Sequence, residues 1–488
     1  MEESSHPYRH TKIIATLGPA TESEEQLCKL ILAGVDVFRL NMAHATREWV
    51  AEVMSRIRRV SAQVGRHVAV MMDVKGPEIR TGTLAKPIKL CAGGRILFCT
   101  ELHQTMSTPP DPMAKDVDGG DIPEVSVNYP DLPRDVQIGA TVLVDSGLMR
   151  FKILEKNETQ ILCEVLTPGT LESRRHINLP GVKVTLPAIT HKDELDLRAG
   201  IDAGIDFVAL SFVRERADVR KLREFLVRAG SPARIVSKIE EQAGVRNMHE
   251  IIEESDAIMI ARGDLGIEVN YQDLPLIQTK MVRACHAEGK PVIIATHLLE
   301  SMIHSPMPTR AEISDVSNAV RELADAVMLS GETTTGAYPL ESVMVLKNII
   351  ESMEPTVGGS LNSCIELREP KAKMLRSSAV LAQELGDSGI IVFTRSGFLP
   401  YVLAALRPKS VPIFAFTDVE PTFRQMLLPW GVEPFLIEFS EDPEQTIQNA
   451  LAYLKKQEWC DPGSWLVVIT NALASEKVID TLQLRQVE

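Results

Sequence analysis

Eight short apolar segments recur in the first two thirds of this 488-residue chain, and most of the intervals between them have helical periodicity, as in 46–65 and 216–230. The segments are residues 12–18, 35–44, 68–76, 206–214, 234–241, 256–266, 291–300 and 325–333. Continuous apolar strands that alternate with helices indicate a parallel sheet covered by helices, and therefore an α/β protein. Eight such repeats predict a closed (β/α)8 barrel, with an open, doubly wound sheet as the alternative.

The alternation of strand-like and helix-like segments is interrupted once, between the third and fourth apolar segments. A second alternating region follows the eighth segment. Between residues 76 and 206 the chain is rich in glycine and proline and contains alternating stretches such as 141–155. This pattern predicts an inserted β-barrel domain at 83–182 that acts as a lid over the barrel mouth. After residue 354 strand-like and helix-like segments return, which predicts a C-terminal α/β regulatory domain at 355–488. The barrel would then comprise residues 1–82 and 183–354.

Composition excludes several classes of partner. The chain is 44% hydrophobic and 24% charged with a net charge of −14, which favours a soluble globular protein and argues against nucleic acid or an anionic membrane. Its seven cysteines are odd in number and lack metal-ligand spacing, as in reduced cytosolic proteins. No run approaches the ~18 apolar residues of a membrane span. We therefore expect a cytoplasmic protein that binds neither nucleic acid nor membrane.

Polar or charged residues end seven of the eight segments, all but the first. In a barrel of this kind the active site lies at the carboxyl ends of the strands. Residues two apart on a strand point to the same side, which predicts four same-side pairs: Arg39 with Asn41, Asp73 with Lys75, Lys238 with Glu240, and Arg262 with Asp264. One such pair alone is more often an ion pair than a catalytic group. Their collection at one end of the barrel indicates a catalytic site.

The residue types narrow the chemistry of this site. Glu240 and Asp264 are hard oxygen ligands suited to Mg²⁺ or Mn²⁺. Arg39, Arg80 and Lys238 suit a phosphate and a developing negative oxygen. The sequence has no Walker-type phosphate loop, no dinucleotide fingerprint, no H-E-x-x-H motif and no Cys–His or Ser–His arrangement at these strand ends. These features predict a magnesium-assisted reaction of a small phosphorylated or enolic acid.

At these residues the chain resembles the pyruvate kinase family, in its bacterial type, almost from end to end. The resemblance is carried by "TKIIATLGPAT", "FRLNMAH", "MDVKGPEIRTG", "IVSKIEEQAGV", "IMIARGDLG", "PTRAEISDVSNAV" and "VMLSGETTTGAYPLE". It implies transfer of phosphate from phosphoenolpyruvate to ADP, giving pyruvate and ATP. It also implies Mg²⁺ or Mn²⁺ and K⁺ as cofactors and a homotetramer.

The resemblance implies a role for each matching residue. The catalytic residues would be Lys238 and Thr296. The substrate would be bound by Arg39, Lys238, Gly263, Asp264 and Thr296. The divalent metal would be held by Glu240 and Asp264, and potassium by Asn41, Asp73 and the backbone carbonyl of Val74. The nucleotide would lie beside Asn41, His44, Arg80 and Arg175.

The departures of the sequence from the family pattern include its potassium site and its C-terminal effector loop. Ala43 stands where the potassium site usually has a serine, but Glu78 keeps the acidic residue that accompanies potassium dependence. In the C-terminal domain, Thr394, Arg395, Ser396 and Gly397 are kept as the predicted effector loop, whereas residues 398–400 lack hydroxyl and basic groups. The tail also lacks a glycine-rich loop. We expect a monophosphate effector, either a sugar phosphate or AMP, rather than fructose 1,6-bisphosphate; the alternative is that 394–397 only starts a helix.

Two other functions remain open from the sequence. A metal-dependent lyase or aldolase of pyruvate-like acids would share the barrel, the metal and the arginines but needs neither a lid nor Arg80. A catalytically silent metabolite sensor would require loss of Lys238 or of the metal carboxylates, and all three are present.

Overall fold

The computed structural model of the chain describes residues 8–100, 122–357, 361–367, 369–474 and 477–487. Every predicted site residue falls within these ranges. Parts of all three predicted domains, including residues 101–121 of the insertion, lie outside the described residues.

Eight parallel strands close into a barrel, which confirms the predicted fold class and makes the open-sheet alternative wrong. They are β1 (Lys12–Thr16), β2 (Val37–Asn41), β3 (Ala69–Val74), β12 (Phe207–Leu210), β13 (Arg234–Ile239), β14 (Ala257–Ala261), β15 (Val292–Ala295) and β16 (Ala326–Leu329). Each strand lies beside the next one along the chain, and β16 closes the barrel on β1 with Lys12 opposite Ala326.

The barrel strands are buried on both faces, as their continuous apolar sequences require. Successive residues of a strand join two separate clusters: Ile14 and Met71 belong to one, whereas Ile13 and Val70 join the larger cluster that includes the surrounding helices. The main surrounding helices are α1 (Glu24–Ala33), α2 (Arg47–Val64), α5 (His191–Asp202), α6 (Arg216–Arg228), α8 (Met248–Glu254), α10 (Leu274–Glu288), α11 (Arg310–Arg321) and α13 (Pro339–Met353).

Local sequence signals set the ends of these helices. The hydroxyl of Thr46 accepts the amide of Trp49 at 3.2 Å at the start of α2, and Gly65 ends that helix with φ 72°. A reciprocal capping box of Thr309 and Glu312 starts α11. The helices that cover the barrel thus begin and end where the sequence supplies caps.

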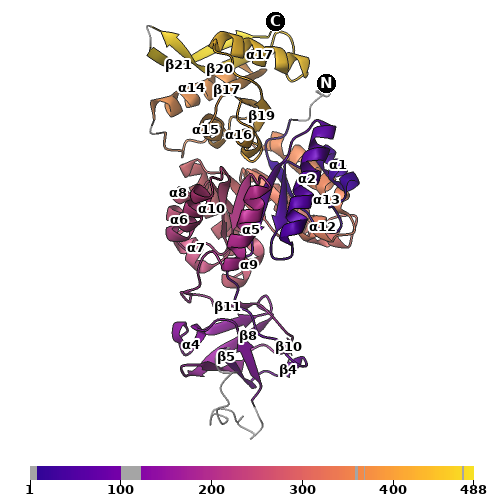
Figure 1. Cartoon of the computed structure of the whole chain (residues 1–488), viewed down its shortest axis with the longest axis vertical. Helices are drawn as coiled ribbons and strands as arrows, with labels where there is room; N and C mark the ends of the chain where they lie inside the picture. Colours follow the sequence, from indigo (N-terminus) through magenta and orange to yellow (C-terminus); the bar gives the residue numbers. More distant parts are fainter. Residues whose placement is uncertain (1–7, 101–121, 358–360, 368, 475–476, 488) are drawn as a thin grey trace.

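The chain leaves the barrel after β3 and forms a β domain before it returns at α5. Its described strands make a six-stranded sheet and a separate two-stranded sheet. The larger sheet has the order β11 (Ile177–Asn178), β7 (Thr141–Val144), β8 (Met149–Lys156), β9 (Gln160–Val165), β5 (Arg95–Thr100) and β6 (Glu124–Val127), and the smaller pairs β10 (Gly169–Leu171) with β4 (Ile88–Leu90). This domain lies at one end of the molecule next to α9 (Arg262–Glu268), which directly follows β14 (Figure 1). It is therefore on the side where the barrel strands end, the position expected of a lid.

The C-terminal domain contains a five-stranded sheet with the order β19-β18-β17-β20-β21. The strand-like segments 389–394, 412–417 and 464–470 overlap β17 (Ser388–Phe393), β18 (Ile413–Thr417) and β20 (Trp465–Ala474), and the helix-like segment 377–386 overlaps α14 (Pro370–Leu385). Sequence reasoning missed β19 (Val432–Leu436) and β21 (Lys477–Gln486). The remaining helices of this domain are α15 (Phe398–Leu406), α16 (Glu420–Gln425) and α17 (Pro443–Lys456).

This C-terminal domain lies at the opposite end of the barrel from the inserted domain (Figure 1). Arg407 and Arg424 reach from it to Asp325 and Asp206, which precede β16 and β12. Each of the seven cysteines is a free thiol. Within the described part of the chain, we find no helix with the length and apolar character needed to cross a membrane.

Candidate active site

Asp73 is the centre of a buried charge cluster at the mouth of the barrel, with an exposed fraction of 2%. Its Oδ2 accepts a hydrogen bond from Nε of Arg39 at 2.6 Å, and its Oδ1 lies 3.2 Å from Nζ of Lys238. Burial raises the pKa of Asp73, but the charges of Arg39 and Lys238 outweigh burial and hold the pKa below its ordinary value. The ionised carboxylate thus brings together two cations from different strands.

Lys238 also contacts Glu240, which confirms that these two residues share a side of the barrel. Nζ of Lys238 lies 2.9 Å from Oε1 of Glu240, and Oε2 of Glu240 accepts the amide of Phe212 at 2.7 Å. Burial raises the pKa of Glu240 to about 7, and the negative charges of Asp264 and Asp73 add to that rise against the opposing charge of Lys238. Burial lowers the pKa of Lys238, but Asp73 and Glu240 outweigh it and hold the pKa above its ordinary value. The mouth therefore contains a charged ammonium and a surplus of carboxylate.

Glu240 and Asp264 fit a divalent cation by the chemistry of their oxygens. Asp264 lies half-buried in the first turn of α9, and no described side chain donates a hydrogen bond to its carboxylate. Its charge raises the pKa of the nearby Glu240, so extra positive charge between the two carboxylates would be favourable. The described residues contain no group of three or more Asp, Glu, His or Cys side chains arranged around a metal. Two carboxylates suit Mg²⁺, which keeps waters and takes further oxygens from its substrate.

Gly263 and Thr296 meet beside Asp264. The amide of Gly263 donates to Oγ1 of Thr296 at 2.7 Å, and the hydroxyl of Thr296 donates to the carbonyl of Ala295 at 2.7 Å. Thr296 and His297 both have positive φ, 67° and 54°, which is uncommon for residues with a side chain. This backbone at the end of β15 turns the Thr296 hydroxyl toward the start of α9.

The prediction that Arg262 and Asp264 point to the same side of a strand is wrong. Strand β14 ends at Ala261, so both residues lie in the first turn of a helix rather than on a strand. Arg262 is buried and pairs with Asp315 at 2.7 Å while donating to the carbonyl of Thr296 at 2.7 Å. Arg262 fixes α9 against α11 and β15. Of the two residues, only Asp264 joins the carboxylates at the barrel mouth.

The residues predicted to bind potassium lie together where β2 and β3 end. The side-chain oxygen of Asn41 accepts the amide of Ala43 at 3.1 Å, and the carbonyl of Val74 accepts the hydroxyl of Ser211 at 2.7 Å. Both carboxylate oxygens of Asp73 face cations, as described above. Every predicted potassium ligand thus has a protein partner in this arrangement.

The residues predicted to bind the nucleotide lie at the junction of barrel and lid. Nε of Arg80 lies 2.6 Å from Oε2 of Glu78, and Arg80 pairs as an isolated bridge with His176. Arg175 lies 3.2 Å from Asp145 and its Nε is buried without a partner. His44 is exposed in the loop after β2.

Sequence reasoning missed two hydroxyl residues of the site. The hydroxyl of Ser211, after β12, lies 2.8 Å from Nζ of Lys238 and 3.3 Å from Oδ1 of Asp73. Oγ1 of Thr16, the last residue of β1, accepts from Arg39 at 3.2 Å. The first strand therefore does end in a polar residue of the site, contrary to the prediction. The position of Ser211 and Thr16 at strand ends was the sequence signal that could have identified them.

The predicted effector loop lies at the start of α15, far from the barrel mouth. The amide of Gly397 donates to Oγ1 of Thr394 at 2.9 Å, and Gly397 has φ 80°. Arg395 is already paired with Asp418, at distances of 2.7 to 3.0 Å. The carbonyl of Ser396 accepts from Arg234, the first residue of β13, at 2.7 Å. The loop is thereby linked to the strand that holds Lys238.

Comparisons with known proteins agree along the whole chain. The family model "Pyruvate kinase, barrel domain" matches residues 8–343, and "Pyruvate kinase, alpha/beta domain" matches residues 372–484. Plastidial pyruvate kinase 2 of Arabidopsis thaliana is 38% identical over 486 residues, covering 98% of this chain and 81% of the relative. The pyruvate kinase of Dictyostelium discoideum is 37% identical over 487 residues, covering 97% of this chain and 93% of the relative.

A bacterial relative and a solved structure extend the comparison. The pyruvate kinase of Staphylococcus saprophyticus is 38% identical over 482 residues, covering 96% of this chain and 79% of the relative. A crystal structure of a pyruvate kinase from Cryptosporidium parvum matches with a TM-score of 0.89 and 34% identity, over 98% of this chain and 96% of that one. The sequence motifs, the fold and these matches lead to one conclusion: the chain belongs to the pyruvate kinase family and is a kinase.

Proposed function

We propose that this chain transfers the phosphoryl group of phosphoenolpyruvate to ADP, giving pyruvate and ATP. The observation that carries the proposal is the charged Lys238, held between Asp73 and Glu240 at a buried mouth. Phosphoryl transfer depends on positioning and charge neutralisation more than on covalent catalysis. A fixed ammonium beside an arginine and two carboxylates supplies these requirements.

In this reaction the bond between phosphorus and the enol oxygen breaks, and a bond forms from phosphorus to a terminal oxygen of ADP. Arg39 binds the phosphate of the substrate, and Lys238 neutralises the charge on the phosphoryl group and on the departing enolate oxygen. The enolate then takes a proton at its terminal carbon to give pyruvate. The hydroxyl of Thr296 lies at the site and assists that proton transfer.

The remaining substrate groups are bound by backbone and lid residues. The amides of Gly263 and Asp264 receive the substrate carboxylate, in place of the bond that Gly263 now makes to Thr296. Arg80 and Arg175 bind phosphates of the nucleotide, since both lie where the lid joins the barrel.

Asn41, the last residue of β2, and His44, in the loop after it, contact the nucleotide as well.

Glu240 and Asp264 would hold Mg²⁺ or Mn²⁺, which would supply positive charge to oxygens of the substrate and of the transferring phosphate. Potassium at Asn41, Asp73 and the Val74 carbonyl, a homotetrameric assembly and a cytoplasmic location complete the proposal, as the sequence predicts. Activity retained in full without potassium would remove the potassium site from it.

The role of Lys238 is tested by Lys238→Met. We expect kcat for ATP formation to fall by about 10²–10³-fold or more because a preorganised cation is lost from the transition state. Binding of phosphoenolpyruvate, measured by calorimetry, should remain detectable. Lys221→Met, an exposed lysine on α6, is the matched control and should leave kcat unchanged. A near-normal kcat in the Lys238 variant would reject the assignment.

We propose further that a monophosphate regulates the enzyme through the loop Thr394–Gly397. The start of α15 and the side chain of Arg395 suit one phosphate, and Phe398 stands where a second would need a cation or hydroxyl. Substrate titrations with AMP, a hexose monophosphate and fructose 1,6-bisphosphate test this. We expect a monophosphate to lower the substrate concentration at half-saturation and the bisphosphate to leave it unchanged. A strong effect of the bisphosphate would contradict the proposal.

A further inference from the structure

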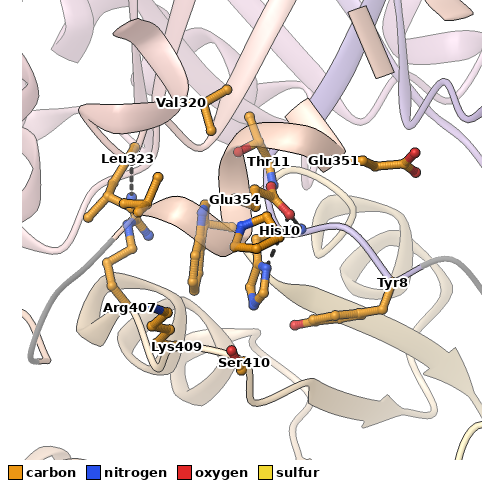
Figure 2. A pocket seen from close by; sticks show the side chains of 13 residues that line it. Tyr8, His10, Thr11, Val320, Leu323, Glu351, Glu354, Arg407, Lys409 and Ser410 are labelled. Atoms are coloured by element: carbon orange, nitrogen blue, oxygen red, sulfur yellow. Dashed lines mark hydrogen bonds and ion pairs between the residues drawn. The ribbon is translucent and has the colours of Figure 1, made fainter. Parts of the chain in front are cut away.

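A cavity of about 230 Å³ lies between the barrel and the C-terminal domain, at the end of the barrel opposite the active site (Figure 2). Its walls come from four parts of the chain: the segment 8–11 before β1, the end of α11, the end of α13 with the turn 354–357, and residues 407–430 of the C-terminal domain. It shares no lining residue with the catalytic site or with the loop Thr394–Gly397.

The cavity gathers buried polar atoms that lack a hydrogen-bond partner. Eight such side-chain atoms occur among the described residues, and four of them belong to residues that line this cavity. These four are Nε2 of His10, Oγ1 of Thr11, Oε1 of Glu351 and Nε of Arg407. Buried polar atoms in proteins are nearly always bonded, so their concentration here indicates a missing partner molecule.

The four atoms include both donors and acceptors. Nδ1 of His10 faces the carboxylate of Glu354 at 3.3 Å, and Nε2 on the other side of the ring is left without a partner. Oε1 of Glu351 is an acceptor, and Nε of Arg407 is a donor. A partner must therefore present hydrogen-bond donors and an acceptor at the same time.

Positive charge lies at one end of the cavity. Arg407 and Lys409 lie on one side of Figure 2, and Glu351 lies on the opposite side. Asp325 balances the charge of the buried Arg407 at 2.6 Å, so Arg407 offers the N–H of its unpartnered Nε, and Lys409 supplies the unbalanced charge. Lys409 is exposed at the rim and pairs with no carboxylate in the described part of the chain. This end suits a phosphate or carboxylate.

The opposite end favours hydroxyl groups over a second cation. The ammonium of Lys347 lies 3.7 Å from Oε1 of Glu351, so the charge of this carboxylate is already balanced although its oxygen lacks a hydrogen bond. Glu354 is likewise satisfied by the amides of His10 and Thr11, at 3.1 and 2.6 Å. Neutral donors are therefore better partners here than an ammonium group.

The rest of the lining is aromatic and aliphatic. The ring of Trp430 stacks on that of His10 with centroids 4.1 Å apart, and Val320 and Leu323 add apolar surface. Such walls suit the carbon-bearing faces of a small molecule whose polar groups point outward.

We propose that this cavity binds a small hydroxylated anion of the sugar-phosphate or sugar-acid type. Its phosphate or carboxylate binds Lys409 and the Nε of Arg407, and a hydroxyl at its other end donates to Glu351. The proposal does not depend on the catalytic roles assigned above, because it concerns binding alone.

Calorimetric titration of the full chain tests the proposal. The probes are a hexose 6-phosphate, a hexonate, the neutral hexose, inorganic phosphate and alanine. In the Arg395→Met variant, which lacks the cation of the effector loop, we expect the hexose phosphate or the hexonate to bind with saturation. The hexose, phosphate and alanine should bind at least about tenfold more weakly, since each lacks half of the required groups. The phosphate and carboxylate probes then distinguish the two sources of the anion.

Variants locate the bound probe. Lys409→Met and Glu351→Ala should each weaken binding about tenfold or more, and Val357→Trp should block it by filling the cavity. Lys373→Met, which removes an exposed lysine from α14 of the same domain, is the matched control. Arg395→Met separates this cavity from the effector loop. Both control variants should bind the probe with unchanged affinity.

Three results would overturn the proposal. They are the absence of saturable binding by either anion, loss of binding in the Arg395 variant but not in the cavity variants, and preferential binding of alanine. Equal thermal unfolding midpoints of the unliganded variants would show that any loss of affinity does not come from misfolding.

Discussion

The two ends of the barrel use the same charged residue types in opposite ways. At the end where the strands start, four aspartates are each paired with an arginine. At the mouth, carboxylates outnumber the cations that face them, and burial raises the pKa of Glu240 to about 7. The first arrangement stabilises the fold and the second leaves charge for a ligand to balance.

The paired end follows a regular pattern. An aspartate precedes every second strand of the barrel and accepts the amide of a residue on the adjacent strand. The four bonds are Ile13 to Asp36 at 2.7 Å, Val70 to Asp206 at 2.8 Å, Ile235 to Asp256 at 2.8 Å and Val292 to Asp325 at 3.0 Å. Each aspartate also pairs with at least one arginine. Two of these arginines, Arg407 and Arg424, dock the C-terminal domain.

The substitution Asp206→Ala gives the largest expected effect in a test of this difference between the two ends of the barrel. This change removes the buried carboxylate that pairs with Arg58 and Arg424 and frees the amide of Val70, so we expect a loss of about 3 kcal/mol in unfolding free energy. The kcat of the folded enzyme should stay close to normal, because no active-site group is lost. Denaturant titration with parallel kinetics measures both quantities.

The control for that experiment is Asp202→Ala, an exposed carboxylate on α5, which should shift stability by less than about 0.5 kcal/mol. A large fall in kcat for Asp206→Ala without a loss of stability would break the proposed division between the two ends.

A smaller effect is expected from His286, which lies at the same domain junction. Burial lowers its pKa to about 4, the charge of Arg407 adds to this, and Asp325 opposes it. Since the unfolded value is near 6.5, the unfolded chain binds the proton more readily, and stability falls as pH drops from about 6.5 towards 4. At pH 5 the loss is up to about 2 kcal/mol.

His286→Asn should therefore flatten the dependence of unfolding free energy on pH between 6.5 and 4, while leaving the slope above pH 7 unchanged. Denaturant titrations at several pH values measure this. An unchanged acid limb in the variant would show that other groups control acid stability.

The features that sequence predicted are those carried by local patterns. The eight strands were predictable because buried parallel strands are continuous apolar runs, and the contact of Lys238 with Glu240 follows from their spacing of two residues. The same rule failed for Arg262 because β14 ends one residue before it. Ser211 and Thr16 were missed because serine and threonine are also common in loops, so one hydroxyl at a strand end does not identify a site.

Features built from distant parts of the chain were not predictable in this way. The strand β19 contains Glu433 and Pro434, which weaken a strand pattern, and only its pairing with β18 makes it a strand. The junction cavity depends on His10 stacking with Trp430, residues that are far apart in the sequence. Such contacts arise only when the domains dock.

The central claim is that Glu240 and Asp264 bind one divalent cation beside Lys238. Titration of Mn²⁺, followed by its electron paramagnetic resonance signal, tests this directly without relying on activity. The account predicts that Glu240→Gln and Asp264→Asn each weaken Mn²⁺ binding by about tenfold or more, whereas Lys238→Met and the neighbouring Glu241→Gln do not. Unchanged Mn²⁺ affinity in both carboxylate variants would contradict the account.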